Sequence, residues 1–449
     1  MKQKKNKIHL LPDQIIVLGF LCVIAVGSIL LTLPIATQDG NGTGIMDAAF
    51  TATSAVCVTG LVVHNTATYW SMFGQFVIIC LIQIGGMGVC TVAVTIAIVS
   101  GRKIGLMQRS AMQEAISAPN IRGIVRLTYF IIRMTIGTEL IGAAIMAPIF
   151  CGRFGFIKGI WYAIFHSVSA FCNAGFDLMG IRTPFVSLTE FCGEPIINIV
   201  IMCLIVWGGI GFLTWEDIWS HKWHIKKYKM QSKVILATTL ILIVVPALYF
   251  YFVEFGGSAW DAFSQKERIL ASFFQSITPR TAGFNTVDLN LFDGAGKAII
   301  ITLMLIGGSP GSTAGGIKTT TIAVLAASTL AVFKRNQDAH YCGRRIATET
   351  VKYASAVFIM YSMLFLLSGI TISTIEQIPI TECLFETASA IGTVGLSLGI
   401  TAELGTLSKI ILIALMYMGR VGGLTLVFAT TMNYKNPQSR YPQEKITVG

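Results

Sequence analysis

"MDAAFTATSAVCVTGLVV", residues 46–63, is a moderately apolar segment too short to cross a membrane, followed by a glycine in a short turn. The same arrangement returns as "WYAIFHSVSAFCNAGFDL" (161–178), "ILASFFQSITPRTAGFNTVD" (269–288) and "CLFETASAIGTVGLSLGI" (383–400). Aligning the copies superposes four glycines, each followed by Leu or Phe: Gly60, Gly175, Gly283 and Gly395. Pairs of hydroxyl residues precede these glycines at matching places: Thr53 and Ser54, Ser167 and Ser169, Ser276 and Thr278, and Thr387 and Ser389. Four copies in one order predict a repeated structural unit.

The surrounding composition places this unit in a membrane. Of the 449 residues, 54% are hydrophobic and 12% are charged, whereas soluble proteins carry about 25% charged residues. About 20 apolar helical residues cross a bilayer core, and eight segments of this kind occur: 14–33, 70–99, 127–150, 195–214, 233–253, 296–333, 353–375 and 405–432. The sequence therefore predicts an all-α membrane protein with eight transmembrane helices that lie in the lipid bilayer.

The net charge of +11 follows the predicted topology. Basic residues gather in alternate connections and at both ends of the chain: Lys2, Lys4, Lys5, Lys7, Arg102, Lys103, Arg109, Arg122, Arg126, Lys222, Lys226, Lys227, Lys229, Lys233, Lys334, Arg335, Arg344, Arg345, Lys352, Lys435, Arg440 and Lys445. The other connections hold most of the acids. The positive-inside rule makes the basic side, including both termini, cytoplasmic. The basic excess is thus a topology signal, and we expect no nucleic-acid partner.

Each predicted unit consists of a span, a short pore helix, a filter turn and a second span. The expected boundaries are 1–100 (filter near 57–61), 101–222 (filter near 172–176), 223–340 (filter near 280–284) and 341–449 (filter near 392–396, then a short cytoplasmic tail). Non-helical backbone at membrane depth is tolerated only where protein buries it or where it lines a wet cavity. Four such turns around a pseudo-fourfold pore would aim carbonyl oxygens and helix carboxyl ends at a monovalent cation. Glycine permits the necessary backbone dihedrals.

The phrases "SAVCVTGL", "SAFCNAGFD", "SITPRTAGFNT" and "SAIGTVGLS" resemble the filter phrases of the Trk/Ktr/HKT superfamily of potassium transporters over nearly the whole chain. The chain looks most like the membrane subunit of a bacterial Ktr potassium uptake system, because it lacks the extra amino-terminal helix pair of Trk-type members. Some plant relatives have Ser in place of the first filter glycine, so Gly60 favours potassium over sodium. The resemblance implies carbonyl ligands for potassium from Val58, Thr59, Gly60, Asn173, Ala174, Gly175, Thr281, Ala282, Gly283, Thr393, Val394 and Gly395.

The stretch "IITLMLIGGSPGSTAGGIKTTTIAVLAAS", residues 300–328, interrupts the sixth apolar segment. A phosphate loop has the form G-x-x-x-x-G-K-[ST] after a strand, but Ile317 separates Gly316 from Lys318 here and both flanks belong to an apolar span. Glycines and proline disfavour helix, so the sequence predicts a broken membrane helix. In the resembled family an intramembrane loop at this position acts as a gate. That role falls on Gly307, Gly308, Ser309, Pro310, Gly311, Gly315, Gly316 and Lys318 in the gate loop 307–318.

Two arginines lie at membrane depth. Arg420 interrupts the last span, where a cation marks a functional position, and the resemblance implies that it contacts the gate loop and limits flux; alternatively it only ties the broken helix to freed carbonyls. Arg280 lies three residues before Gly283. A guanidinium in a cation pore would oppose conduction, so we expect Arg280 to face away, towards a carboxylate or backbone carbonyls.

The resemblance implies potassium as the transported ion, sodium as an activator, a homodimer with two pores, and a cytoplasmic RCK-type nucleotide-binding regulatory subunit. We expect no organic cofactor, no metal beyond potassium and a multi-pass position in a bacterial cell membrane. The alternative is a secondary transporter for an organic solute with a midplane site, although Glu139 is the clearest carboxylate inside a span. An enzyme is not expected, since no H-E-x-x-H, G-x-S-x-G or paired acids occur in the spans.

Overall fold

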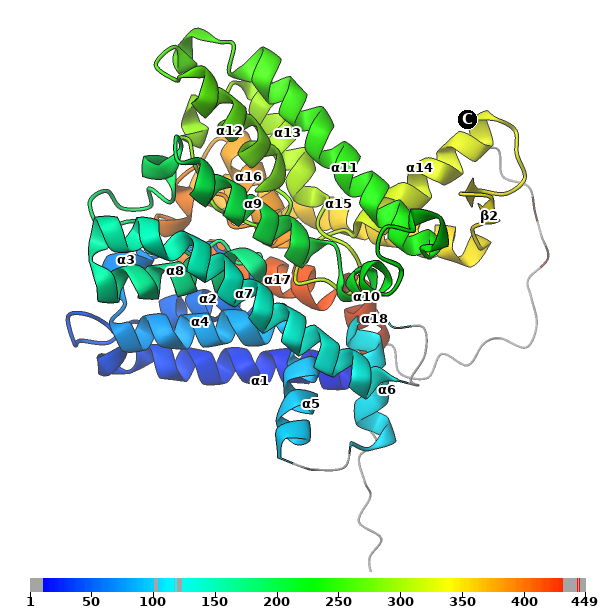
Figure 1. Cartoon of the computed structure of the whole chain (residues 1–449), viewed down its shortest axis with the longest axis horizontal. Helices are drawn as coiled ribbons and strands as arrows, with labels where there is room; N and C mark the ends of the chain where they lie inside the picture. Colours follow the sequence, from blue (N-terminus) through cyan, green and yellow to red (C-terminus); the bar gives the residue numbers. More distant parts are fainter. Residues whose placement is uncertain are drawn as a thin grey trace, which may run out of the picture.

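The computed structural model describes residues 11–100, 104–116, 118, 123–430, 442 and 444. The basic residues Lys2, Lys4, Lys5, Lys7, Arg102, Lys103, Arg122, Lys435, Arg440 and Lys445 lie outside the described residues, as do both termini. The described part is mostly helical, and its one sheet is a two-stranded hairpin of β1 (His340–Tyr341) and β2 (Arg344–Arg345). Figure 1 shows this hairpin projecting from the helical body at the end of α14.

Four long helices are apolar enough to cross a membrane without interruption. They are α1 (Pro12–Thr32), α7 (Ile124–Phe154), α11 (Met230–Tyr249), which continues as a π-helical turn to Glu254, and α15 (Thr348–Glu376). Each is the first long helix of one of the four expected units. The helix α1 starts with Pro12 at its first position and Asp13 in its first turn, both of which favour a helix amino terminus.

A short helix follows each long one and ends at one of the four glycine turns. These half-helices are α2 (Ile45–Val56), α8 (Phe156–Phe171), α12 (Gln265–Ile277) and α16 (Ile380–Gly392). The start of α12 is fixed by a capping box, in which Ser264 accepts from the Glu267 amide at 3.3 Å and Glu267 accepts from the Ser264 amide at 2.9 Å. At 12 to 16 residues these helices are too short to span a membrane.

The second helix of each unit is broken. The pairs are α4 (Met72–Met87) with α5 (Val89–Val99), α9 (Pro195–Gly209) with α10 (Phe212–His221), α13 (Gly294–Leu305) with α14 (Thr319–Phe333), and α17 (Thr406–Val421) with α18 (Gly423–Thr430). The first pair is bent by 97° and the second by 99°. Figure 1 shows α5 leaving the direction of α4 nearly at a right angle.

The apolar segments 70–99, 195–214 and 405–432 are therefore not single straight spans. The breaks fall at Gly88, Gly211 and Gly422, whose φ angles are 84°, 92° and 92°. Other residues avoid this region. By length and composition the described residues contain four uninterrupted candidate spans, or up to six when each strongly bent pair counts as one. The remaining elements are the short helices α3 (Thr66–Tyr69) and α6 (Leu106–Ile116) and several turns of 3₁₀ helix.

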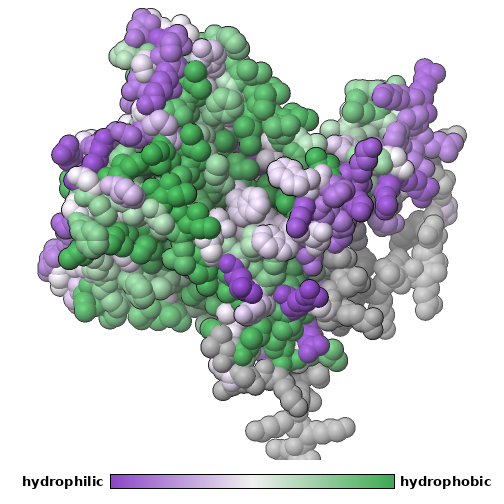
Figure 2. All heavy atoms as spheres, in the orientation of Figure 1, coloured by the Kyte–Doolittle hydropathy of each residue, from purple (hydrophilic) through white to green (hydrophobic). Residues whose placement is uncertain are grey.

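The interior and the surface are both apolar. Two large clusters of buried side chains fill the molecule, one mainly from residues before position 285 and one mainly from residues after position 250. Many large apolar side chains are nonetheless exposed on the long helices, including Ile29, Leu140, Leu240 and Leu367. Figure 2 shows this apolar surface as a broad area over the helices, with hydrophilic side chains gathered on loops at either end and on the hairpin. Such a surface suits lipid contact.

Candidate functional site

The four glycine turns share one unusual backbone conformation. Two residues before each glycine, a residue other than glycine adopts a left-handed conformation, with φ of 50° at Val58, 57° at Asn173, 71° at Thr281 and 52° at Thr393. The glycines Gly60, Gly175, Gly283 and Gly395 have φ of 89°, 69°, 82° and 94°. A left-handed residue other than glycine costs about 1–2 kcal/mol. Its recurrence at four equivalent positions indicates that the shape of the turn is needed at the place where the turns meet.

The turns form a closed ring in chain order. A methyl group at Gly175 would lie 2.7 Å from the carbonyl oxygen of Ala282 in the third turn. By the same test Gly60 abuts the Ala174 oxygen, Gly283 the Val394 oxygen, and Gly395 the Thr59 oxygen. The residue before each glycine thus presents its carbonyl to the glycine of the preceding turn, and the fourth turn returns to the first. The ring surrounds a common centre with backbone from all four units.

Hydroxyl groups from the half-helices hold the turns. Ser54 accepts from the Gly60 amide at 3.1 Å and Ser389 accepts from the Gly395 amide at 3.0 Å. Ser169 donates to the Phe176 carbonyl at 2.7 Å, and Thr278 donates to the Phe284 carbonyl at 2.6 Å. All four hydroxyl residues are buried, so the ring is fixed by side chains that water does not reach.

The third turn has one extra residue between its hydroxyl phrase and its glycine. Ser276 therefore points to α11, where it donates to the Ile243 carbonyl at 2.5 Å, and Thr278 supplies the supporting hydroxyl. Arg280 in this turn also contacts α11, with Nη2 3.5 Å from the Thr239 hydroxyl. The sequence predicted a carboxylate or backbone carbonyls as the partner of Arg280. In the structure its partner is instead the hydroxyl of Thr239, on the first helix of the same unit.

A cavity of about 540 Å³ opens on the side where the chain leaves the turns. All four glycines line it, together with Asp177 and Asp288. Asp177 accepts from the Met179 amide at 2.9 Å, but desolvation outweighs this and the bond from Ser187 and raises the pKa of the Asp177 carboxyl to about 6. The cavity is a mouth of the ring that carries negative charge at neutral pH.

The loop between α13 and α14, residues 307–318, closes the opposite side of the ring. Its ends are pinched together, because the Gly307 amide donates to the Ile317 carbonyl at 2.8 Å and the Thr319 amide to the Gly308 carbonyl at 3.0 Å. Its tip reaches the half-helix α8, where the Thr313 hydroxyl donates to the Phe171 carbonyl at 3.1 Å. Gly315 packs against Thr393 of the fourth turn, so that a methyl group there would lie 2.9 Å from the Thr393 methyl.

The loop also caps the broken second helices of the second and fourth units. The Ser309 and Thr313 amides donate to the carbonyls of Gly209 and Gly208 at 2.9 and 3.3 Å, and the Gly316 amide donates to Gly419 at 3.2 Å. Carbonyls at a helix carboxyl terminus lack partners within the helix. The loop supplies some of these partners and is thereby held beneath the ring. Because the segment before the loop is the helix α13 and not a strand, a phosphate loop is excluded here.

Two cations lie at this level, and both contact backbone. Arg420 donates to the Thr313 carbonyl of the loop, to the Gly85 carbonyl, and to the Gly86 carbonyl at 3.0 Å. Lys318 donates to the carbonyls of Ala314 and Gly315 at 2.8 and 3.4 Å. Within the described ranges, no carboxylate forms an ion pair with either residue. Arg420 therefore links the loop of the third unit to the second helix of the first.

The sequence contains a second fourfold pattern, a glycine-rich phrase at the end of each second helix, which the sequence analysis did not identify. These phrases lie where the contacts of the loop and of Arg420 are made. The phrases "GGMG" (85–88), "GGIG" (208–211), "GGSPG" (307–311) and "GRVG" (419–422) end the straight part of each second helix. The first glycine of three phrases abuts a half-helix carbonyl: Gly85 that of Val56, Gly208 that of Phe171, and Gly419 that of Ile391. Arg420 takes the place of the second glycine. The repeated glycine pairs were the signal that could have revealed this layer.

The sequence matches the profile of TrkH, described as a cation transport protein, over residues 12–441. It is 39% identical to the potassium/sodium uptake protein NtpJ of Enterococcus hirae over 100% of this chain and 99% of that protein. It is 37% identical to the Ktr system potassium uptake protein B of Bacillus subtilis, covering 98% of this chain and 97% of that protein. The crystal structure of the potassium transporter TrkH from Vibrio parahaemolyticus has a similar fold, with a TM-score of 0.72 and 21% identity over 96% of this chain and 87% of that chain.

Proposed function

Because the chain belongs to the TrkH family of cation transport proteins, we propose that it takes up potassium across a bacterial cell membrane through the ring of four turns. The resemblance to the Trk/Ktr/HKT superfamily is confirmed by this membership, and the chain is an ion transporter and not an enzyme. Relatives of nearly equal length carry potassium uptake in their names, which supports potassium as the cargo.

The main support for potassium transport through the turns is that the four turns form a closed ring, in which each glycine abuts a carbonyl of the next turn. Potassium must lose water to pass a narrow pore, and a ring of backbone carbonyls can replace its hydration shell. The proposed ligands are the carbonyls of residues 58–60, 173–175, 281–283 and 393–395, in the four turns that follow the half-helices. The half-helix carboxyl ends add partial negative charge towards the same centre. Potassium enters from the mouth that contains Asp177, loses water in the ring and leaves past the loop.

The loop at residues 307–318 acts as the gate, and Arg420 restrains it. Support comes from its position beneath the ring, its bonds to the second helices of the second and fourth units, and the contact of Arg420 with the Thr313 carbonyl. A cation in this position opposes the passage of potassium electrostatically. Opening requires the loop to move away, and this breaks contacts between the loop and the other units without changing the turns themselves.

Each unit of the chain supplies one quarter of the pore. The units are residues 1–100, 101–222, 223–340 and 341–449, with eight membrane crossings in all and both termini cytoplasmic. The supporting observations are the four long helices, one at the start of each unit, and the broken second helix that follows each half-helix. The basic connections support an orientation in which the loop side of the ring faces the cytoplasm.

The transporter works as a homodimer with a cytoplasmic RCK-type nucleotide-binding subunit, and sodium stimulates it. Several relatives are named as proteins of a Ktr system, which supports a further subunit. The regulator would act through the cytoplasmic side, where the loop and the basic connections lie. The name of the Enterococcus hirae relative includes sodium and supports testing this ion as an activator.

A secondary transporter for an organic solute is the competing function. Such transporters commonly use carboxylates near the membrane midplane for coupling. Glu139 is buried beside the second turn, where Gln83 donates to it at 3.3 Å and Cys172 lies 3.9 Å away. A lone carboxylate supports a coupled solute site less well than the paired carboxylates that such sites often contain.

The test is flux of potassium or rubidium into liposomes that contain the purified protein, with and without sodium, alongside the Gly175→Ser variant. We expect potassium-selective flux that loses selectivity in the variant, because a side chain at Gly175 meets the Ala282 carbonyl. Flux that saturates with an organic solute and ignores potassium would replace the proposal with the competing function. If no flux occurs, adding an RCK-type subunit tests whether the partner is obligatory.

A further inference from the structure

The helix α10 and the segment after it, residues 212–229, form a surface that ion conduction does not use. The 99° bend between α9 and α10 turns α10 close to the membrane plane if α9 crosses the membrane. Trp219 on α10 is 67% exposed and Trp223 in the next segment is 94% exposed. Tryptophan gathers at the boundary between lipid headgroups and acyl chains. This orientation places residues 219–229 at the inner membrane surface.

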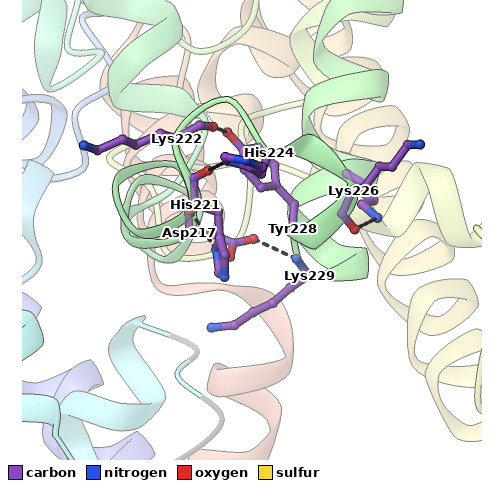
Figure 3. A network of polar contacts seen from close by, with 8 residues as sticks. Asp217, His221, Lys222, His224, Lys226, Tyr228 and Lys229 are labelled. Carbon is purple, nitrogen blue, oxygen red and sulfur yellow. Dashed lines mark hydrogen bonds and ion pairs between the residues drawn. The ribbon is translucent and has the colours of Figure 1, made fainter.

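The segment is held in a fixed shape by a buried carboxylate. Asp217 is 2% exposed, and its carboxylate accepts from the Lys229 amide at 2.8 Å and lies 3.0 Å from His221 Nδ1. Tyr228 donates to the Lys222 carbonyl. Figure 3 shows these contacts folding the segment back on α10, while the lysine side chains extend away from it. The basic groups are therefore presented by a structured turn.

A cavity of about 600 Å³ separates α10 from the start of α7. Its wall includes Leu127, Phe130 and Trp219, and its polar lining includes Arg126, Lys229 and Glu216. The rings of Phe130 and Trp219 meet edge to face with centroids 6.4 Å apart. Two cations against one carboxylate, beside an apolar and aromatic wall, suit a ligand with an anionic head and an acyl chain.

We propose that this cavity binds one anionic phospholipid of the inner leaflet. The phosphate lies between Arg126 and Lys229, and the upper acyl chain follows Leu127, Phe130 and Trp219. Arg126 lies in the first turn of α7, whereas Lys229 lies directly before α11 and donates its amide to Asp217 of α10. The lipid therefore joins the start of α7 to the turn that is bonded to α10. The bound lipid stabilises the observed position of α10.

The same helix contacts the gate loop at its other end. The Phe212 amide donates to the Gly311 carbonyl at 2.7 Å, and a methyl group at Gly211 would lie 2.6 Å from the Pro310 carbonyl. A ligand shifts an equilibrium towards the state that it binds better. A lipid that holds α10 in place therefore favours the loop position seen beneath the ring and lowers flux. This part of the inference rests on the proposed gate function, whereas the lipid site does not.

Lipid binding is tested by quenching of Trp219 fluorescence in reconstituted protein, isolated by subtracting the signal of the Trp219→Phe variant. We expect brominated phosphatidylglycerol to quench Trp219 more strongly than brominated phosphatidylcholine. The double variant Arg126→Gln/Lys229→Gln should lose this difference. The matched control Lys226→Gln/Lys227→Gln removes equal charge from exposed residues of the same segment that do not line the cavity, and it should keep the difference.

Equal quenching by the two lipids would overturn the site and would favour an acidic protein surface as the partner of these basic residues. Loss of the difference in both double variants would also overturn it, since diffuse surface charge would then explain the preference. For the link to the gate, we expect potassium flux about fivefold lower in phosphatidylglycerol than in neutral vesicles, the lower end of coupling between two sites. Unchanged flux despite selective quenching would remove that link. Absence of flux even in neutral vesicles would instead count against the proposed function.

Discussion

The ring of turns and the loop beneath it, the proposed gate at residues 307–318, are built in opposite ways. The ring repeats one backbone shape four times, is held by buried hydroxyls, and places main-chain carbonyls against glycines. The loop occurs once, and its attachments include two cationic side chains with carbonyl partners. A structure made of repeated backbone resists change because each quarter constrains its neighbours. The loop is held by individual hydrogen bonds, so the proposed roles of the ring in selectivity and of the loop in gating can be tested by separate substitutions.

The largest expected effect comes from breaking the ring at Gly395. In Gly395→Ala the methyl group meets the Thr59 carbonyl and the φ of 94° is strained. Left-handed strain of about 1–2 kcal/mol corresponds to roughly a tenfold change in an equilibrium. We expect the preference for potassium over sodium in liposome flux to fall by about tenfold.

The matched control for this variant is Gly399→Ala, which also has positive φ, 104°, but has open space around the site. It shares the backbone strain and lacks the contact with another turn. If Gly399→Ala changed the ion preference as much as Gly395→Ala, backbone strain and not the ring contact would be responsible.

The second effect comes from releasing the loop at Arg420. Arg420→Ala removes bonds to the Thr313, Gly85 and Gly86 carbonyls, and hydrogen bonds to charged groups contribute about 1.5–3 kcal/mol each. We expect potassium flux to rise by about tenfold, equivalent to about 1.4 kcal/mol, with the potassium preference unchanged. Isotope flux and reversal potentials in the same vesicles measure both quantities.

Arg153→Ala serves as the control for charge removal, since Arg153 lies at the end of α7 and pairs with Glu190 at 3.7 Å. Its flux should match that of the unaltered protein. A folded Arg420→Ala protein with unchanged flux would make Arg420 a structural tie of the broken helix. A changed ion preference would mean that the ring and the loop are not separable.

The sequence predicted the ring more completely than the layer beneath it. The glycine turns could be found because each repeats a short phrase within a few residues of a half-helix, and the break at residues 307–318 could be found from its glycines and proline. The bends at Gly88 and Gly211 were missed because apolar composition continues through them, so hydropathy alone predicts straight spans at 70–99 and 195–214. The partners of Arg420 could not be predicted either, since Gly85 lies 335 positions away in the chain.

The smallest expected effect is a pH dependence of potassium flux that arises at the mouth of the ring and not at the loop on its other side. Asp177 lines the mouth of the ring, and burial raises the pKa of its carboxyl from 3.8 to about 6. Above pH 6 the carboxylate is charged and attracts cations, and below pH 6 it becomes protonated and this attraction is lost. The Asp177 carboxylate acts on the entry of cations at the mouth and not on the loop at residues 307–318. We therefore expect potassium flux at low potassium concentration to fall about twofold to threefold as the pH drops through 6, an effect of less than 1 kcal/mol.

Asp177→Asn should remove this pH dependence and give low flux at every pH. Asp288→Asn should retain it, because this change at the same cavity leaves the Asp177 carboxyl in place. Flux measured at saturating potassium should show little dependence, since attraction at the mouth changes entry and not the later passage past the loop. If the pH dependence persisted in Asp177→Asn and vanished in Arg420→Ala, the titrating group would belong to the gate. In that case the pH-dependent step would lie at the loop with its cationic side chains, and the charged entrance would not control cation entry.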